Sequence, residues 1–187
     1  FYHDKVSGKA PKDVKFVATE ATACPSITKG EYMYDHGDTA RITPLVKMHT
    51  LGHNFIPPQI HAGGLRYNGI ARTLSVLKEA NMLETKAYNQ VEVFDAAKTF
   101  IESEVIVPAP EPNHAIKAVI DEALRCKETG EEKTLLFLLC GHGYFDMQAY
   151  DDYNHGKLLP YDYPQEKVQK AVAKIRELYP WLETLPY

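Results

Sequence analysis

Short apolar segments alternate with segments of helical periodicity along this chain. Apolar side chains recur every three or four residues from Val91 to Glu104 and from His114 to Cys126, as on one face of a helix. Val105–Val107 and Thr134–Leu139 instead have the length and composition of strands, and the second is apolar on both faces, as in a covered parallel sheet. This alternation predicts an α/β fold with a parallel sheet flanked by helices.

Weaker patterns fill in the rest of the chain. The other expected elements are a strand at 14–20, a short helix at 44–51, a loose helix at 70–83 and an amphipathic helix at 165–179. Pro164 and Pro180 bound the last helix, and Gly130 is a stop signal after the helix that ends near Cys126. Because no repeat, low-complexity tract or linker interrupts the sequence, residues 1–187 are predicted to form a single domain.

The composition is that of a globular protein, with 44% hydrophobic and 25% charged residues. No stretch approaches the ~20 apolar residues of a membrane helix. The net charge of −4 gives no electrostatic reason to expect nucleic acid or a membrane surface as partner. Cys24, Cys126 and Cys140 are an odd number at wide spacing and no CxxC occurs, which disfavours a disulfide framework. We therefore expect a cytoplasmic protein.

Two turns follow directly on the expected strands. Gly141, His142 and Gly143 come after one strand, and residues 108–111 come after the other. In parallel α/β sheets, ligands bind beyond the carboxyl ends of the strands, so these two turns can face one pocket. The spacing alone leaves equally open that both are plain turns.

Four sequence blocks resemble those of a known enzyme family. They are ACPSITKGEYMYDHGDT (Ala23–Thr39), LGHNFIPPQIHAGGLRYNG (Leu51–Gly69), EVIVPAPEPNHAI (Glu104–Ile116) and CGHGYFD (Cys140–Asp146). Blocks of this kind, in this order, are typical of the second, α-subunit-independent branch of the tryptophan synthase β-chain family. The resemblance implies a type II fold of the pyridoxal-phosphate (PLP) enzymes, and a lyase of tryptophan biosynthesis that joins L-serine and indole to L-tryptophan by β-replacement.

The resemblance also implies which residues face the cofactor. Cys140 stands where family members have a serine that faces the pyridine nitrogen of PLP, and Gly141 follows it in the same turn. Glu111 matches a glutamate on the ring side of the pocket, and Gly64 matches a glycine that passes close to the cofactor. A thiol is a weaker hydrogen-bond partner than a hydroxyl, so we expect a weakened contact at Cys140. The alternative is that Cys140 is a small buried filler.

Substrate and ion contacts are also implied by the resemblance. Arg66 lies where this branch has an arginine, which could pair with a substrate carboxylate, although a surface or interdomain salt bridge fits it equally well. The carbonyls of Tyr67 and Gly69 match a region where family members hold a monovalent cation. The family's Schiff-base lysine and glycine-rich phosphate loop have no counterpart in this sequence, so no catalytic residue is expected in this chain.

These gaps predict that the chain is most of the larger, C-terminal domain of a type II PLP enzyme, without the N-terminal half. The parent enzyme is expected to be a homodimer that binds PLP, whereas the isolated chain is expected to be inactive and not to hold the cofactor. Two other interpretations stay open. The chain could be a non-catalytic truncated or cleaved piece, or it could belong to an enzyme with a related PLP-dependent β-replacement or deaminase activity.

Two further features suggest different chemistry. His49 and His53 are four residues apart and His61 follows, and histidines at such spacing can share a zinc ion on a helix. Gly52 would end a helix at this point, however, and no HExxH occurs. Tyrosines crowd the region after Gly143, where capping a core is commoner than forming a stacking surface. Neither feature is predicted to be a site.

Overall fold

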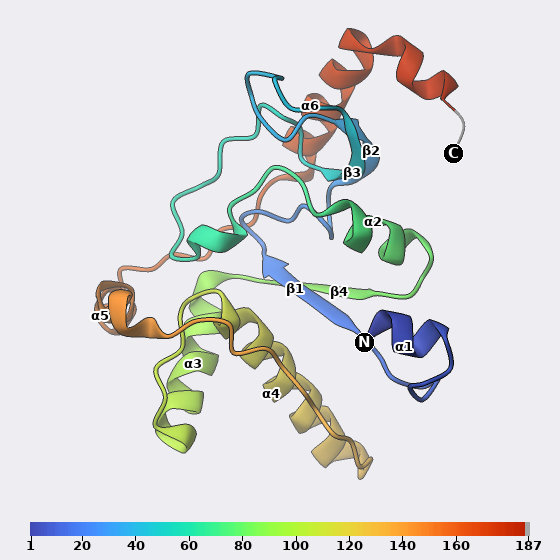
Figure 1. Cartoon of the computed structure of the whole chain (residues 1–187). Coiled ribbons are helices and arrows are strands. Elements are labelled where there is room, and N and C mark those ends of the chain that lie inside the picture. The colour runs from blue at the N-terminus through green and yellow to red at the C-terminus, as the bar shows by residue number, and fades with distance from the viewer. Residues whose placement is uncertain (186–187) are drawn as a thin grey trace.

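The computed structural model describes residues 1–185 and contains two small sheets (Figure 1). Strands β1 (Val17–Ala21) and β4 (Glu84–Tyr88) pair in parallel, whereas β2 (Glu31–Asp35) and β3 (Val46–Thr50) pair antiparallel. The α-helices are α1 (Tyr2–Val6), α2 (Arg72–Glu79), α3 (Gln90–Glu104), α4 (Pro112–Thr129), α5 (Met147–Asn154) and α6 (Gln165–Leu178). Short 3-10 turns are η1 (Gly63–Leu65), η2 (Gly143–Phe145) and η3 (Pro180–Thr184).

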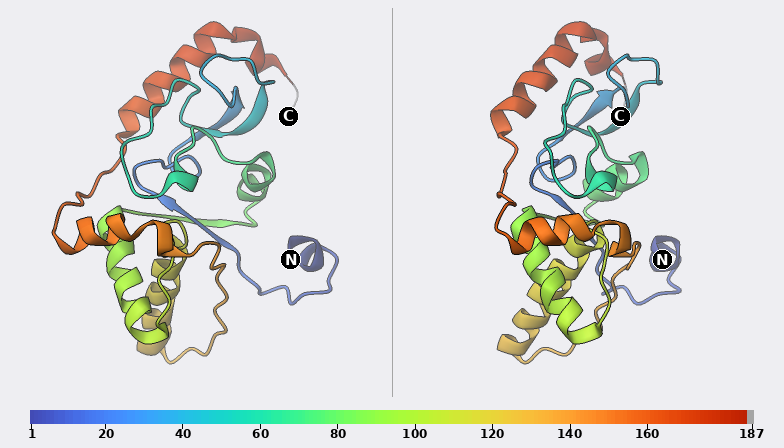
Figure 2. Two further views of the ribbon diagram at one scale, coloured as in Figure 1. Left: turned by 60° about the vertical axis from the view of Figure 1, so that its left-hand side comes forward. Right: turned by 90° about the vertical axis from the view of Figure 1, so that its left-hand side faces the viewer.

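Helices flank the parallel sheet. α4 packs against β1 and β4, and α3 packs against both α4 and α5. Figure 2 shows these three helices on one side of the β1–β4 pair, with the β2–β3 hairpin and α6 on the other side. α2 packs against β3, and α6 packs against β2. The predicted α/β fold, with a parallel sheet flanked by helices, is confirmed, and it agrees with the C-terminal part of a type II fold.

The local sequence explains where the long helices begin and end. The Asn89 side chain caps α3 by accepting hydrogen bonds from the N–H groups of Val91 and Glu92, and the Glu92 carboxylate accepts the Asn89 N–H in return. Gly130 ends α4 in the left-handed conformation, with φ of 71°. The expected helices that became α3, α4 and α6 are confirmed. No helix among residues 1–185 is both long and apolar enough to cross a bilayer.

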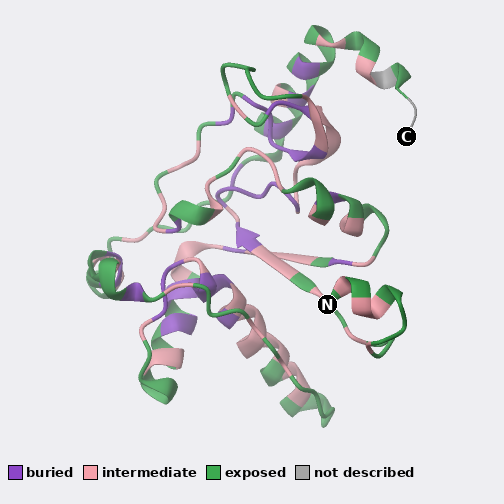
Figure 3. Cartoon of the chain, in the orientation of Figure 1, coloured by how far each residue is buried: buried purple, intermediate pink, exposed green. Residues whose placement is uncertain are grey.

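Buried apolar residues form two clusters. Figure 3 marks the buried positions along the chain in purple. The cluster under α3 and α5 consists of Tyr88, Val93, Phe94, Ala97, Ala149 and Tyr150. The cluster under α6 consists of Ala23, Cys24, Leu51, Phe55, Tyr163, Val168 and Val172. Burying a large apolar side chain stabilises a fold by about 1.5–3 kcal/mol. These clusters therefore fix α5 and α6, and with them the two polar sites described below.

Residues 44–51 contain a strand and not the expected short helix. β3 pairs with β2, so that Met48 lies opposite Met33 and Thr50 opposite Glu31. The hairpin gives the backbone of this segment its hydrogen-bond partners, which a short isolated helix would leave largely unsatisfied at its ends. β2, β4 and α5 were not predicted, because each is at most eight residues long and carries too little periodicity to be recognised.

Val105–Val107 and Thr134–Leu139 are not strands. A strand that is apolar on both faces needs neighbours that cover both faces, and no strand lies beside either segment within residues 1–185. As a result, Leu136 and Leu138 are 83% and 76% exposed. A single antiparallel bridge, between residues 108 and 142, joins the ends of the two segments.

Candidate functional site

Two turns, at residues 107–111 and 140–143, lie side by side. Two backbone hydrogen bonds join them, from the Ala109 N–H to the Gly141 carbonyl at 3.0 Å and from the Gly143 N–H to the Val107 carbonyl at 2.8 Å. The turns that the sequence placed beyond two strand ends therefore do form one surface. They do so even though the segments that lead into them are irregular.

The close approach of the two turns requires glycine at both contact points. A Cβ on Gly141 would lie 2.8 Å from the Cβ of Ala109, and a Cβ on Gly143 would lie 2.4 Å from the Pro108 carbonyl oxygen. Side chains at these positions would push the turns apart. The Gly-His-Gly sequence is thus explained by backbone packing.

Tyr150 of α5 holds the 107–111 turn in place. Its buried hydroxyl donates to the Pro108 carbonyl at 2.6 Å and accepts from Asn113 Nδ2 at 3.3 Å. Burial raises the pKa of Tyr150 to about 12, so the hydroxyl keeps its proton and remains a donor at neutral pH. Neither Tyr150 nor Asn113 was predicted, because tyrosines in this region were expected to cap the core and a bond between residues 42 positions apart leaves no local pattern.

Glu111 ties a third segment to this surface. It is the N-cap residue of α4, and its Oε1 accepts the Gly64 N–H at 2.7 Å. A Cβ on Gly64 would lie only 3.2 Å from the Glu111 Cγ, so η1 and the start of α4 approach closely. The structure therefore brings together Gly64, Glu111 and Gly141. Cys140 precedes Gly141 with a free, exposed thiol, and the alternative that it is a buried filler is wrong.

Two buried polar atoms beside these turns have no hydrogen-bond partner among the described residues. They are Oδ1 of Asn113 and Nε2 of His114. His114 Nδ1 lies 3.1 Å from the Pro110 carbonyl, and burial lowers the pKa of His114. The ring is therefore neutral, Nδ1 carries the proton, and Nε2 presents a lone pair to which nothing in the described chain donates.

The residues predicted for substrate and cation lie just after η1. Arg66 Nη2 donates to the Pro57 carbonyl at a long 3.4 Å, and its Nε is buried without a partner among the described residues. Tyr67 is 62% exposed. Gly69 forms a bridge with Thr50 on β3. All three residues continue the segment that Gly64 fastens to α4, but only Gly69 is seen to pair with the β2–β3 hairpin among these contacts.

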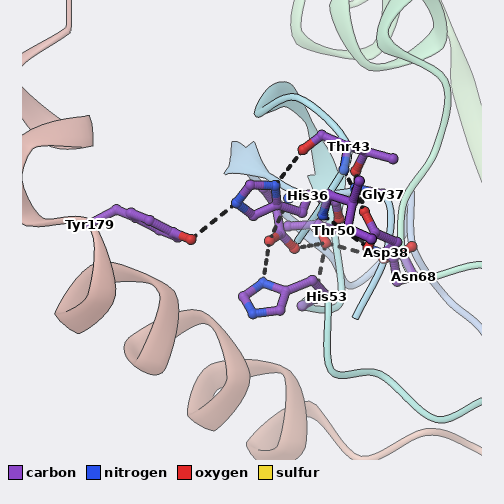
Figure 4. Close-up of polar contacts among 11 residues, drawn as sticks. His36, Gly37, Asp38, Thr43, Thr50, His53, Asn68 and Tyr179 are labelled. Atoms are coloured by element: carbon purple, nitrogen blue, oxygen red, sulfur yellow. Dashed lines mark hydrogen bonds and ion pairs between the residues drawn. The ribbon is translucent and has the colours of Figure 1, made fainter. Parts of the chain in front are cut away.

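A second polar cluster joins the β2–β3 hairpin to the loop at residues 51–55 (Figure 4). Asp35 is fully buried, and its carboxylate accepts from His53 Nδ1 at 2.6 Å, from Thr50 Oγ1 at 2.7 Å and from the His36 N–H at 2.8 Å. A buried carboxylate is costly unless it is hydrogen-bonded, and these three donors satisfy it. The Asp35–His53 contact joins residues 18 positions apart through the hairpin, so no local sequence pattern predicts it.

His36 extends this cluster toward the end of α6. Its Nδ1 lies 2.6 Å from the Thr43 carbonyl, and its Nε2 lies 3.1 Å from the hydroxyl of Tyr179. Its ring meets the His53 ring edge-on at 5.8 Å. The hairpin, the 51–55 loop and the C-terminal end of α6 are therefore connected through side chains around one buried carboxylate.

The three histidines considered for zinc do not converge. Each pairs with a different carboxylate, His49 with Glu79, His53 with Asp35 and His61 with Asp152. Among residues 1–185, no group of three or more histidine, cysteine, aspartate or glutamate side chains is arranged to hold a metal ion. The spacing in the sequence thus reflects a strand and a loop, which point these side chains to different places.

Three curated relatives share high sequence identity with this chain. It is 58% identical to the tryptophan synthase beta chain 2 of Aquifex aeolicus and 57% identical to that of Methanosarcina acetivorans, over 159 residues in each case. It is 52% identical over 166 residues to the tryptophan synthase beta chain of Thermococcus onnurineus. The chain belongs to the tryptophan synthase β-chain family. The three matches cover 84%, 85% and 89% of this chain but 37%, 36% and 37% of the relatives, so the chain spans little more than a third of their length. No protein-family model matches it.

The four blocks that suggested the β-chain family meet at two places in the structure. Blocks 104–116 and 140–146 form the paired turns, and the end of block 51–69 joins them through η1. Block 23–39 and the beginning of block 51–69 meet instead at Asp35. The segment 51–69 therefore connects the two polar sites of this family member.

Proposed function

We propose that this chain is the C-terminal, cofactor-facing part of a PLP-dependent tryptophan synthase β-like enzyme that joins L-serine and indole to L-tryptophan. The convergence of Gly64, Glu111 and Gly141 beside the exposed Cys140 thiol carries this proposal. Residues 1–187 would form most of one domain, and an N-terminal part like that of the relatives would supply the cofactor lysine. The chain alone would then be inactive.

These residues fit one wall of a PLP site. Gly64 and Gly141 keep the wall flat, and the Gly64 N–H holds the Glu111 carboxylate in place. The Cys140 thiol offers the pyridine nitrogen a weak, uncharged hydrogen-bond partner. PLP, when bound, supplies the electron sink that β-replacement requires. The turns at 62–66, 107–111 and 140–143 contain no lysine, so in this proposal the wall orients the cofactor and another segment anchors it.

Arg66 would contact the substrate. Its Nε is buried without a partner among the described residues, and its Nη2 makes only one long contact. A guanidinium with unused donors can bind a carboxylate in bidentate fashion, so Arg66 would pair with the carboxylate of L-serine. The carbonyls of Tyr67 and Gly69 would face a monovalent cation nearby.

A chimeric enzyme tests this proposal. The corresponding part of the Aquifex aeolicus β chain 2 is replaced by this chain, and tryptophan formation from L-serine and indole is measured in the presence of PLP. The chimera is expected to form tryptophan, whereas this chain alone is expected to form none. A folded chimera that forms no tryptophan would contradict the proposal, and pyruvate release from serine without tryptophan would favour the deaminase alternative.

Variants of Cys140 in the same chimera test the wall itself. Cys140→Ser restores the stronger hydrogen-bond partner and is expected to keep or raise the activity, while Cys140→Asp places a charge at the ring nitrogen and is expected to lower the activity at least tenfold. Cys126→Ser is the matched control, because Cys126 lies on α4 outside the paired turns. Equal activity of the Cys140→Asp and Cys126→Ser chimeras would show that Cys140 does not contact the cofactor.

A further inference from the structure

A cationic groove lies between the 51–55 loop and α6. Figure 1 shows α6 at a distance from α5 and from the start of α4, where the paired turns lie. Its volume is about 210 Å³. Three lysines of α6, Lys167, Lys170 and Lys174, line one side, and His53 lines the other. The groove is thus large enough for a small molecule, but not for a folded partner.

The walls of the groove are fixed by close packing. Gly52 adopts a φ of +98°, and a Cβ there would lie 2.7 Å from the Cβ of Ala171 on α6. Next to it, Leu51 and Phe55 belong to the same buried cluster as the inner face of α6. The loop backbone therefore rests directly on the helix, and the groove keeps its shape without a ligand.

His53 contributes a largely buried imidazole ring to the lining of this groove. The side chain is only 2% exposed, and its Nδ1 is engaged by Asp35 at 2.6 Å. Figure 4 shows a dashed line from one ring nitrogen of His53, while the second ring nitrogen, Nε2, points to the other side. Within residues 1–185, the hydrogen bond and ion pair of the His53 ring are made by Nδ1 with Asp35. The buried carboxylate thus fixes the tautomer with the proton on Nδ1, so Nε2 is left for a ligand.

The three lysines concentrate positive charge at the groove. They are spaced three and four residues apart on α6 and therefore share one face of the helix. The Lys167 ammonium lies over the ring of Tyr163, 5.7 Å from its centroid. No acidic side chain lines the groove among the described residues. Because the whole chain carries a net charge of −4, this positive field is local.

We propose that this groove binds a small anion that bears a phosphate group. Lysine ammonium groups bind phosphate as point charges. Three of them on one side of the groove favour a phosphate over a single carboxylate, because the phosphate carries more negative charge. Nε2 of His53 would accept a hydrogen bond from a protonated phosphate oxygen. The volume suits inorganic phosphate or a small phosphate ester. This site would act independently of the proposed PLP wall.

Titration of the full chain with inorganic phosphate at constant ionic strength tests the proposal. Imidazole ¹H–¹⁵N spectra report on His53 directly. We expect its signals to shift saturably, with a dissociation constant in the millimolar range, and acetate to bind at least tenfold more weakly. The absence of a His53 shift, or an equal shift with chloride, would overturn the proposal.

Matched lysine variants separate the groove from general charge. Lys170→Met with Lys174→Met should weaken phosphate binding at least tenfold. Lys98→Met with Lys127→Met removes the same charge from exposed positions on α3 and α4 and should leave binding unchanged. Equal binding by the two double variants would refute the site. Both readouts are independent of tryptophan synthesis, so failure of either proposal can be told apart from failure of the other.

Discussion

Removing the hydroxyl of Tyr150 should destabilise the chain at the 107–111 turn. Tyr150→Phe keeps the ring, whose centroid lies 5.0 Å from that of Phe94, but it leaves the Pro108 carbonyl and the Asn113 amide without this partner. A buried polar group left unsatisfied costs about 1–3 kcal/mol. The bond from Asn113 is long at 3.3 Å, so the loss at Pro108 dominates. We expect the free energy of unfolding to fall by about 2 kcal/mol.

Urea unfolding followed by circular dichroism measures this loss. With a slope of about 2 kcal/mol per molar urea, typical of small proteins, the midpoint should fall by about 1 M at unchanged slope. Tyr144→Phe is the matched control, because Tyr144 is 74% exposed in the neighbouring turn, and its midpoint should not move. If the two variants unfold at the same urea concentration, the Tyr150 hydroxyl does not hold the turn.

Three further predictions follow from single residues. Gly52→Ala should lower the free energy of unfolding by about 3 kcal/mol in a thermal or denaturant melt, since it adds both backbone strain and a clash with α6. Gly130→Ala is the control, because Gly130 also has a positive φ but lies in open space, and it should cost less. Equal losses of stability in the two variants would show that the clash at Gly52 does not matter. A thiol reagent at neutral pH should modify the exposed Cys140 quickly and Cys24 only on unfolding, because burial raises the pKa of Cys24 to about 12; mass spectrometry that finds early labelling of Cys24 would contradict this. Burial also lowers the pKa of His114, so below the ordinary pKa of 6.5 the unfolded chain binds a proton that the folded chain does not. The free energy of unfolding should therefore fall as the pH drops from about 7 to about 5. His114→Gln should make stability depend less on pH in this range, and an unchanged pH dependence would contradict the role of His114.

The helices α3, α4 and α6 could be predicted from the sequence because their signal is local. In α3 and α4, apolar side chains recur over fifteen and eighteen residues, and Gly130 marks an end. The strands are five residues long, and β3 follows Pro44 in a segment that resembles a short helix as much as a strand. Its pairing with β2 is what makes this segment a strand and not a helix. Neither segment alone contains the information that the two will pair. The prediction of a strand at Thr134–Leu139 is wrong for a different reason. Its composition is that of a strand covered on both faces, but no strand lies beside it within residues 1–185.

The candidate sites show the same division between local and distant information. Glycines at close backbone approaches, such as Gly64 and Gly141, leave a trace in the sequence because no other residue fits, and both were predicted site residues. The bonds that position them do not leave such a trace, since Glu111 reaches Gly64 across 47 residues and Tyr150 reaches the 107–111 turn across 42. Family blocks therefore point to the residues of the proposed wall, and the structure shows the hydrogen bonds that hold these residues in place. The groove at α6 is the extreme case, since His53 lies in one family block, the Asp35 that binds His53 from behind lies in another, and the lysines lie in neither.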